Sequence, residues 1–537
     1  MGKNKYTDEQ IDFVKKLVES GADVTPSAVK MCEYYNIIYN ENIGRAFRKR
    51  MQNLGVTNGV EQIEDSDEFQ LAKNKTIDPN KTMFMFGWCQ SDTPVHENFF
   101  DGVEAYAKYH DASLHIIAGR YKNPTSLETS TKLKSGEKNK KAYWHERVLP
   151  YLDAARHNIH KYLCILSDVK VQPTASTPLS GFNGITGLES CIVGHPRVHM
   201  KSLPVLDGYP NKLLLTTGSV SIENYTDTKA GKKGEFHHQL GFIIVELDGD
   251  DFHVRQVTAD DNGNFYDLMY EVKNGKVKIN SKPAKGLVFG DLHVGEEDPA
   301  SIKASFEMAE LFKPNEIVIH DAFNGHSISH HEKKDPFQLL RREEDGSWSL
   351  KKELKQLKDW FKKYDKYNYV VVRSNHDDFL DRWLMGEDWR KSSNKAAYLK
   401  YASILAEGKA PKGIIPYVLM KNFKNIKALG LDDSHRIGDF ECAIHGHLGA
   451  SGSRGSITQF KNLNTKNITG HTHAAAREDG HVCVGTNTYL RVGFNHGASA
   501  WMHSNVVIYP NGKASHINII NGKFTTMKLD FKMKRTE

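Results

Sequence analysis

Five short motifs in the C-terminal half of the chain combine carboxylate, imidazole and amide side chains. They are D-L-H at 291–293, H-D-A-F-N at 320–324, N-H-D at 375–377, H-G-H at 445–447 and G-H-T-H at 470–473. Such oxygen and nitrogen ligands suit Mn, Fe or Zn, and the absence of thiolates among them argues against a structural zinc site. A single motif of this kind is more often a surface loop or a core histidine. The evidence therefore lies in the set and its order.

Each motif follows a short apolar run that is typical of a buried strand. The runs are 286–290, 316–319, 369–373, 440–444 and 467–469. In an open α/β sheet, ligands gather at the carboxyl ends of the strands, so we expect the five termini to converge on one cleft. Two divalent cations there would bring four positive charges, against two from Asp291 and Asp321 and one from a bridging hydroxide. The remaining positive charge would attract a phosphate, which predicts a two-metal phosphoesterase site.

The order of the motifs resembles the calcineurin-like metallophosphoesterase superfamily, which includes SbcD-type DNA nucleases, phosphoprotein phosphatases and nucleotide phosphodiesterases. The resemblance covers about residues 285–509 and implies an α/β sandwich in this region. It implies that one metal is held by Asp291, His293 and His473, the other by Asn375, His445 and His471, that Asp321 bridges them, and that His376 protonates the leaving oxygen. Two positions depart from the family pattern. Where the family has Gly before the bridging Asp and before the Asn-His pair, this chain has His320 and Ser374, so the backbone must differ there or tolerate strain.

The same resemblance implies two divalent metal ions as cofactors. We expect Mn²⁺ first, with Fe, Zn or Mg as alternatives. Further candidates for substrate contact are His326, His330, His331, His447 and Arg454. His445 directly follows its strand and is favoured as the ligand, which leaves His447 as a phosphate contact or a partner of a ligand. The segment 449–456 around Arg454 suits phosphate recognition, and it equally suits a flexible Gly/Ser loop.

Residues 1–57 predict a helical module that resembles a helix-turn-helix unit. T-D-E-Q at 7–10 has the form of a capping box, and a second helix is expected to begin at Thr25-Pro26. The third helix combines an apolar face with basic residues, which are Ile43, Phe47, Met51 and Leu54 on one side and Arg45, Arg48, Lys49 and Arg50 on or near the other. This helix could lie against DNA, or the module could be a docking element with a solvated basic face.

Three further segments complete the predicted organisation. Residues 58–82 are acidic and predict a linker. Residues 83–283 predict an α/β domain, with strands at 83–88, 113–118 and 161–166, a helix at 97–109 and antiparallel strands later in the segment. Residues 284–537 form the predicted metallophosphoesterase domain. Within 229–238, Lys232 and Lys233 could approach a phosphate backbone, but the segment lacks the P-loop pattern, and an exposed polar loop is the favoured interpretation.

The composition limits the class of protein. With 537 residues, 39% of them apolar and 26% charged, the chain is expected to form about three globular domains. The net charge of +6 only weakly favours a polyanionic partner. A polar start at 2–10 and the lack of an 18-residue apolar run predict no signal peptide and no membrane partner, hence a cytoplasmic location. The separate helical module is compatible with a homo-oligomer.

The whole chain resembles the pre-early DNA-degradation (first-step-transfer) proteins of T-odd-like tailed phages. This resemblance rests on the order of helical module, α/β segment with Gly-Lys-Lys-Gly at 231–234, and phosphoesterase domain. It implies a metal-dependent DNase that degrades host DNA early in infection, in the bacterial cytoplasm. Two alternatives remain open. A phosphoprotein or nucleotide phosphatase uses the same metal core, and a DNA-binding transfer or scaffold protein could keep the metal site for regulation.

Overall fold

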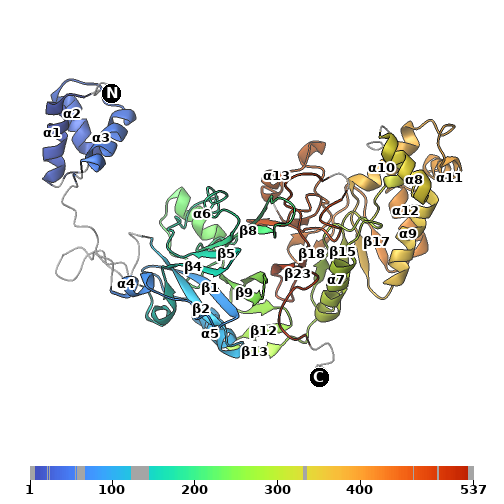
Figure 1. The fold of residues 1–537 in the computed structure, drawn as a ribbon, viewed down its shortest axis with the longest axis horizontal. Coiled ribbons are helices and arrows are strands. Elements are labelled where there is room, and N and C mark those ends of the chain that lie inside the picture. Colours follow the sequence, from blue (N-terminus) through green and yellow to red (C-terminus); the bar gives the residue numbers. More distant parts are fainter. Residues whose placement is uncertain are drawn as a thin grey trace. The chain divides into compact units, whose positions relative to one another are not determined.

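The computed structural model describes residues 6–20, 22, 24–54, 56, 67–121, 144–329, 335–463, 465–492 and 495–529. These residues form two compact units, the N-terminal helices and the chain from residue 68 onward (Figure 1). The class is mixed α/β with N-terminal helices, as the sequence predicts. Among the described residues, no helix combines the length and the apolar character needed to span a bilayer.

The first unit consists of α1 (Asp8–Glu19), α2 (Val24–Tyr34) and α3 (Glu41–Asn53). The predicted capping box is confirmed, because Thr7 Oγ1 accepts a hydrogen bond from the Gln10 amide at 3.3 Å and Gln10 Oε1 accepts one from the Thr7 amide at 3.1 Å. Phe47 lies in the core, whereas Leu54 is 47% exposed. The prediction that Leu54 belongs to the apolar face of the third helix was wrong, because α3 ends at Asn53.

The segment predicted as an acidic linker contains a helix in its described part. Residues 57–66 lie outside the described residues, and α4 (Asp67–Lys73) follows them. Phe69 and Ala72 are buried, and the Phe69 ring stacks on Trp144 with a centroid distance of 5.4 Å. The Ala154 amide donates a hydrogen bond to the Ala72 carbonyl at 3.0 Å. Residues Glu68–Lys73 of α4 therefore belong to the second unit.

A six-stranded sheet lies under the helices of the C-terminal half. Its order is β17-β16-β15-β14-β23-β24, with bounds β14 (Gly286–Val288), β15 (Ile317–Ile319), β16 (Tyr369–Val371), β17 (Ile426–Ala428), β23 (Ser504–Ile508) and β24 (Ala514–Asn518). Strands β14 to β17 are parallel. Strand β23 is antiparallel to β14, and β24 is antiparallel to β23. Apolar residues of α7 (Pro299–Phe312), α9 (Leu350–Lys363), α10 (Asn375–Gly386) and α12 (Ile414–Asn422) pack on one face. Other helices of this half are α8 (Pro336–Asp345), α11 (Lys395–Ala406) and the 3₁₀ turn η2 (His326–Ile328).

The other face of this sheet packs on part of a ten-stranded sheet. The order of the larger sheet is β18-β19-β20-β22-β21-β7-β8-β6-β5-β4. Its C-terminal strands are β18 (Arg436–Ile437), β19 (Phe440–Glu441), β20 (Lys466–Thr469), β21 (Ala476–Glu478) and β22 (His481–Cys483), with η3 (Ala450–Gly452) and α13 (Ile457–Lys461) between them. Val288 and Val318 of the first sheet meet Ile468 and Val482 of the second in one core. The C-terminal half is therefore a three-layer arrangement of helices, sheet and sheet.

The remaining strands of the large sheet come from the segment predicted as a separate domain. They are β4 (Arg156–His160), β5 (Leu163–Leu166), β6 (Ser190–Val193), β7 (Met200–Leu203) and β8 (Lys212–Thr216). Strand β7 pairs antiparallel with β21, so the sheet continues across the predicted boundary at 283/284. The two predicted segments thus share one sheet and fold as one compact unit.

A five-stranded sheet covers the β4–β8 side of the large sheet. Its order is β10-β9-β1-β2-β3, with β1 (Met83–Gln90), β2 (Ser113–Gly119), β3 (Leu152–Asp153), β9 (Gly241–Asp248) and β10 (Asp251–Thr258). Phe86 and Trp88 of β1 pack against Ile192 and Leu215 of the large sheet. The predicted helix at 97–109 is confirmed as α5 (Glu97–Tyr109). The 3₁₀ helix η1 (Glu146–Tyr151) precedes β3, and a small sheet of β11 (Phe265–Asp267), β12 (Tyr270–Lys273) and β13 (Lys276–Ile279) follows β10.

The Gly/Lys-rich segment expected as an exposed loop is a helix, α6 (Lys229–His237). Thr228 caps it, because its hydroxyl accepts a hydrogen bond from the Gly231 amide. A Cβ at Gly231 would lie 1.9 Å from the Thr226 carbonyl oxygen, so this glycine permits a close backbone approach rather than flexibility. Lys232 and Lys233 are both exposed, and the Lys232 ammonium lies 3.3 Å from Asp227 and 3.1 Å from Glu235. The loop expectation was wrong because capping and glycine packing favour the helix.

Candidate metal centre

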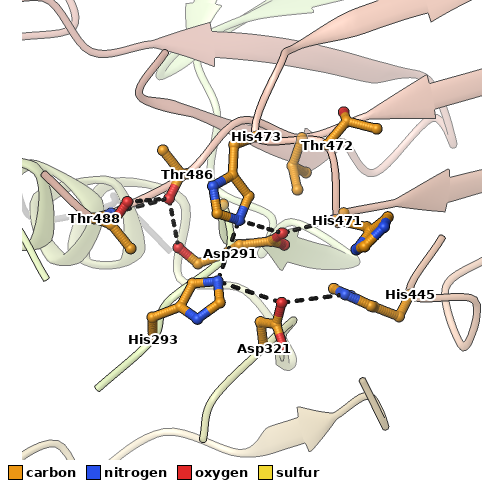
Figure 2. Close-up of polar contacts among 12 residues, drawn as sticks. Asp291, His293, Asp321, His445, His471, Thr472, His473, Thr486 and Thr488 are labelled. Atoms are coloured by element: carbon orange, nitrogen blue, oxygen red, sulfur yellow. Dashed lines mark hydrogen bonds and ion pairs between the residues drawn. The ribbon is translucent and has the colours of Figure 1, made fainter. Parts of the chain in front are cut away.

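The five motifs lie at strand ends, but on two sheets rather than one. The motifs at 291–293, 320–324 and 375–377 follow β14, β15 and β16 of the six-stranded sheet. Those at 445–447 and 470–473 follow β19 and β20 of the ten-stranded sheet. The expectation of a single sheet was incomplete. Because the sheets pack face to face, their strand ends meet at one edge of the sandwich, where Figure 2 shows the side chains converging.

Asp291, His293, Asp321 and His473 form a buried cluster whose ligand atoms all lie within 4.8 Å of one another. Nε2 of His293 lies 3.3 Å from Asp321 Oδ2, and Nε2 of His473 lies 3.1 Å from Asp291 Oδ2. The two Nε2 atoms are 3.1 Å apart (Figure 2). Metal–ligand bonds of about 2.0–2.2 Å in a tetrahedron separate ligand atoms by roughly 3.3–3.6 Å. The spacing is therefore close to that of a metal site.

Several buried atoms of this cluster and of the neighbouring His445 lack a hydrogen-bond partner. Asp291 Oδ1 and Asp321 Oδ1 accept no hydrogen bond, and Nδ1 of His445 and of His473 is also unpaired. A buried carboxylate oxygen without a donor costs free energy, unless a cation binds it. The unpaired oxygens and the converging imidazoles therefore fit divalent metal ions.

The residues assigned to a second ion lie beside Asp321. His445 Nε2 is 3.2 Å from Asp321 Oδ2 and 3.1 Å from Asn375 Oδ1. The His471 ring lies 5.2 Å from that of His445, centroid to centroid, and the His471 amide donates to Asp291 Oδ2 at 2.6 Å. Asp321 thus lies between the His293 group and the His445 group, which is the place that a bridging carboxylate would take.

The backbone at three residues of the cluster, and at His471 beside it, lies in the left-handed region. The φ angles are 42° at His293, 48° at Asp321, 73° at His471 and 56° at His473. Each costs about 1–2 kcal/mol for an L-residue, and such strain gathers at functional sites. At Ser374, φ is −117°, and its hydroxyl caps α10. Ser374, at a position where the family pattern has Gly, therefore needs no strained backbone. At the other such position, His320, the strained residue is the next one, Asp321.

Burial and opposite charges set the protonation of the cluster. Burial alone would raise the pKa of Asp321, but His376, His445 and His293 together hold it well below its ordinary value. Burial lowers the pKa of His293 to about 3. Burial also disfavours protonated His445, but the Asp321 carboxylate outweighs this and raises its pKa to about 9. Since metals bind the neutral imidazole, an ion here must displace the proton of His445.

His376, the predicted general acid, lies next to the cluster. Its ring is 4.6 Å from that of His293, centroid to centroid. Its Nδ1 donates a hydrogen bond to the Asn324 carbonyl at 2.5 Å, which fixes the tautomer and leaves Nε2 as the nitrogen that can exchange a proton. Asn324, from the second motif, therefore orients His376.

Three neighbours of the cluster were not expected from the sequence. His320 is fully buried and can form a group with Asp291 and His445. Asp377 is buried beside the cluster, and burial and the Asp321 charge raise its pKa to about 8. The Trp501 ring lies 4.1 Å from the His473 ring. Asp377 stands inside the N-H-D motif and could have been noticed, whereas nothing in the sequence around Trp501 indicates this contact.

The candidates for substrate contact are spread around the centre. His447 Nε2 lies 3.7 Å from Asp378, and neither ring nitrogen makes a hydrogen bond. His326 is held by Glu296 at 3.0 Å and by Arg342, and Arg454 is exposed. His330 and His331 lie outside the described residues. Lys232 and Lys233 are on α6, and Arg45 and Arg48 are exposed on α3 of the helical unit.

The fold and the cluster define a mixed α/β protein with a buried His/Asp site that can hold divalent metal ions. No protein-family model matches the chain. The chain is similar to protein A1 of Escherichia phage T5, with 30% identity over 481 residues that cover 82% of each chain. The chain belongs to the family of this phage protein.

Proposed function

We propose that this protein is a two-metal phosphodiesterase of the calcineurin-like superfamily, and that its substrate is DNA. The observation that carries the proposal is the buried cluster of Asp291, His293, Asp321 and His473, with its unpaired carboxylate oxygens. Asn375, His445 and His471 complete a ligand set around Asp321. The cytoplasm of an infected bacterium, early in infection, is the proposed setting.

The side chains divide the chemistry between them. Divalent ions, when bound, would supply positive charge to a phosphate and make a bound water more acidic. Asp321 and Asp291 hold their carboxylates ionised for this purpose, because the neighbouring imidazoles keep their pKa values low. His376 donates the Nε2 proton to the departing oxygen, and the Asn324 carbonyl holds its ring in place.

DNA is favoured over other phosphoesters by two observations. The chain belongs to the family of phage T5 protein A1, and its overall order resembles phage DNA-degradation proteins. In addition, α3 exposes Arg45 and Arg48 on the three-helix unit, which suits a phosphate backbone.

The direct test compares substrates and metals. Purified protein with Mn²⁺ is expected to cleave supercoiled plasmid, and to lose this activity in excess chelator. A phosphopeptide and a nitrophenyl phosphate monoester, assayed in parallel, are expected to be hydrolysed far more slowly. Full plasmid cleavage after dialysis into chelator would show that the proposed metal requirement is wrong. Preference for the phosphopeptide would instead support a phosphatase.

Binding of DNA in chelator should show the contribution of α3. Arg48→Ala is expected to weaken binding to a duplex and to reduce the slope of log affinity against log salt by about 1, because one phosphate contact is lost. The matched control is Lys355→Ala on α9, an exposed cation whose ammonium lies 2.5 Å from Asp359. Fluorescence anisotropy over a salt series measures both. An unchanged slope for Arg48→Ala would identify α3 as a docking element.

A further inference from the structure

The segment before the metal domain repeats the topology of that domain. In the metal half, β15, β14, β23 and β24 are neighbours in one sheet, with β14–β15 parallel and β14–β23 and β23–β24 antiparallel. In the segment 83–258, β2, β1, β9 and β10 are neighbours with the same directions. In both segments a helix follows the first strand, since α5 follows β1 and α7 follows β14. Strands β3 and β16 continue each sheet in parallel.

The two halves of the ten-stranded sheet repeat each other as well. The pairs β18–β19, β19–β20, β20–β22 and β21–β22 are antiparallel, parallel, parallel and antiparallel. The pairs β4–β5, β5–β6, β6–β8 and β7–β8 have the same directions in the same chain order. Chance agreement of strand order and direction over both sheets is improbable, because each connection could have been made differently.

A two-fold relation joins the repeats. Met200 pairs with Leu215, which pairs with Ile192, and in the same way Arg477 pairs with Val482, which pairs with Ile468. Met200 and Arg477 therefore occupy equivalent positions, and they pair with each other where β7 meets β21. An equivalent residue facing itself across an interface is the mark of an isologous contact.

Traces of the motifs identify the equivalent site. Phe86-Gly87 and Ile192-Val193-Gly194-His195 correspond to Phe289-Gly290 and Ile468-Thr469-Gly470-His471. The backbone contacts agree, because the Val220 amide donates to the Trp88 carbonyl as the Asn487 amide donates to that of Asp291, both at 2.8 Å. The ligand position of Asp291 is therefore occupied by Trp88.

The equivalent site cannot hold metal. A Cβ on Gly470 would lie 2.1 Å from Asp291 Oδ1, and a Cβ on Gly194 would lie 2.8 Å from Trp88 Cδ1, so the indole fills the place of the carboxylate. Counted from Trp88 and His195, Gln90 stands for His293 and Arg197 for His473. The Ser91 amide donates to the Gly119 carbonyl as the Val294 amide donates to that of Ala322, so Ala118 stands for Asp321. Both carboxylates are gone, and Arg197 adds a cation that is neutralised by Asp479 at 3.0 Å.

Residues of the repeat also contact the segments that carry the candidate metal centre. The Ser202 amide of β7 donates to the Ala475 carbonyl, two residues beyond His473. Val205 forms a β-bridge with Ser499, and Asn211 Nδ2 donates to the Trp501 carbonyl at 2.8 Å. Trp501 in turn packs on His473. These contacts fix the segments on both sides of one proposed ligand.

We propose that residues 83–258 are a second copy of the metal-domain fold that has lost its metal site and now positions His473 through Trp501. The chain is thus a fused pseudo-dimer with one active and one filled centre. The positioning role rests on the proposed metal function.

Crystals of the full chain soaked in Mn²⁺ test the filled centre by anomalous scattering. Ions are expected among the ligands around Asp321, and none beside Trp88. An ion bound at Trp88 or Gln90 overturns the inference. A chain with no ion anywhere would count against the proposed function itself, which separates the two failures.

The positioning role is tested by Mn²⁺ affinity. Asn211→Ala is expected to raise the Mn²⁺ dissociation constant about 10-fold, as loss of a ligand's supporting contact typically does, with an unchanged thermal unfolding midpoint. Trp501→Ala, which removes the ring from His473, is expected to do the same. The control Asn158→Ala changes an exposed residue of β4 and should leave the affinity unchanged. Normal affinity in both Asn211→Ala and Trp501→Ala overturns the positioning role.

Discussion

Asp321→Ala is expected to remove bound metal and abolish DNA cleavage together. The Asp321 carboxylate lies 3.3 Å from His293 Nε2 and 3.2 Å from His445 Nε2, so it is the group that both halves of the ligand set share. Without it, two sets of imidazoles lose their common anion. A loss of about 4 kcal/mol of transition-state stabilisation corresponds to roughly a 10³-fold slower reaction, and we expect at least that decrease.

The measurements are metal content by elemental analysis and plasmid cleavage with saturating Mn²⁺. Asp432→Ala is the matched control, because it removes an exposed carboxylate of the same unit. This control should keep normal metal content and rate. If Asp321→Ala still bound two ions per chain, the bridging role would be wrong, whatever happened to the rate.

His376→Gln is expected to keep the metal and lose the proton transfer. Its Nδ1 is engaged by the Asn324 carbonyl, and its ring lies against His293 without belonging to the buried His/Asp cluster. General acid catalysis contributes about 10² to 10⁴ in rate, so DNA cleavage should fall by that factor while metal content and DNA affinity remain. A nitrophenyl phosphodiester needs less help, since its leaving group is already acidic. The loss on that substrate should be much smaller.

Comparing the two substrates separates proton donation from simple damage to the site. His435→Gln serves as the control, because His435 bonds Glu316 at 3.1 Å and is not part of the cluster. Equal losses on both substrates, or loss of a metal ion in His376→Gln, would rule out the general-acid role. A loss confined to DNA would support it.

The sequence by itself determined the local features of this protein. The capping box at Thr7, the helix α5 and the strands that lead into the motifs follow from short-range patterns, since hydrogen-bonding and burial preferences act within a few residues. Membership in the family of phage T5 protein A1 confirms the resemblance found over the whole chain. In contrast, α6 was missed because glycine packing against Thr226 depends on neighbours that composition does not reveal.

Only the tertiary structure decided how distant segments combine. The five motifs were expected on one sheet, but two facing sheets bring them together, and Trp501 reaches His473 through contacts with β7 and the residues that follow it. The repeated fold is hidden in the sequence because little more than Phe-Gly and Ile-x-Gly-His remain of its motifs. Strand order and direction persist when side chains change, since backbone hydrogen bonds specify them and many apolar side chains can fill the same core.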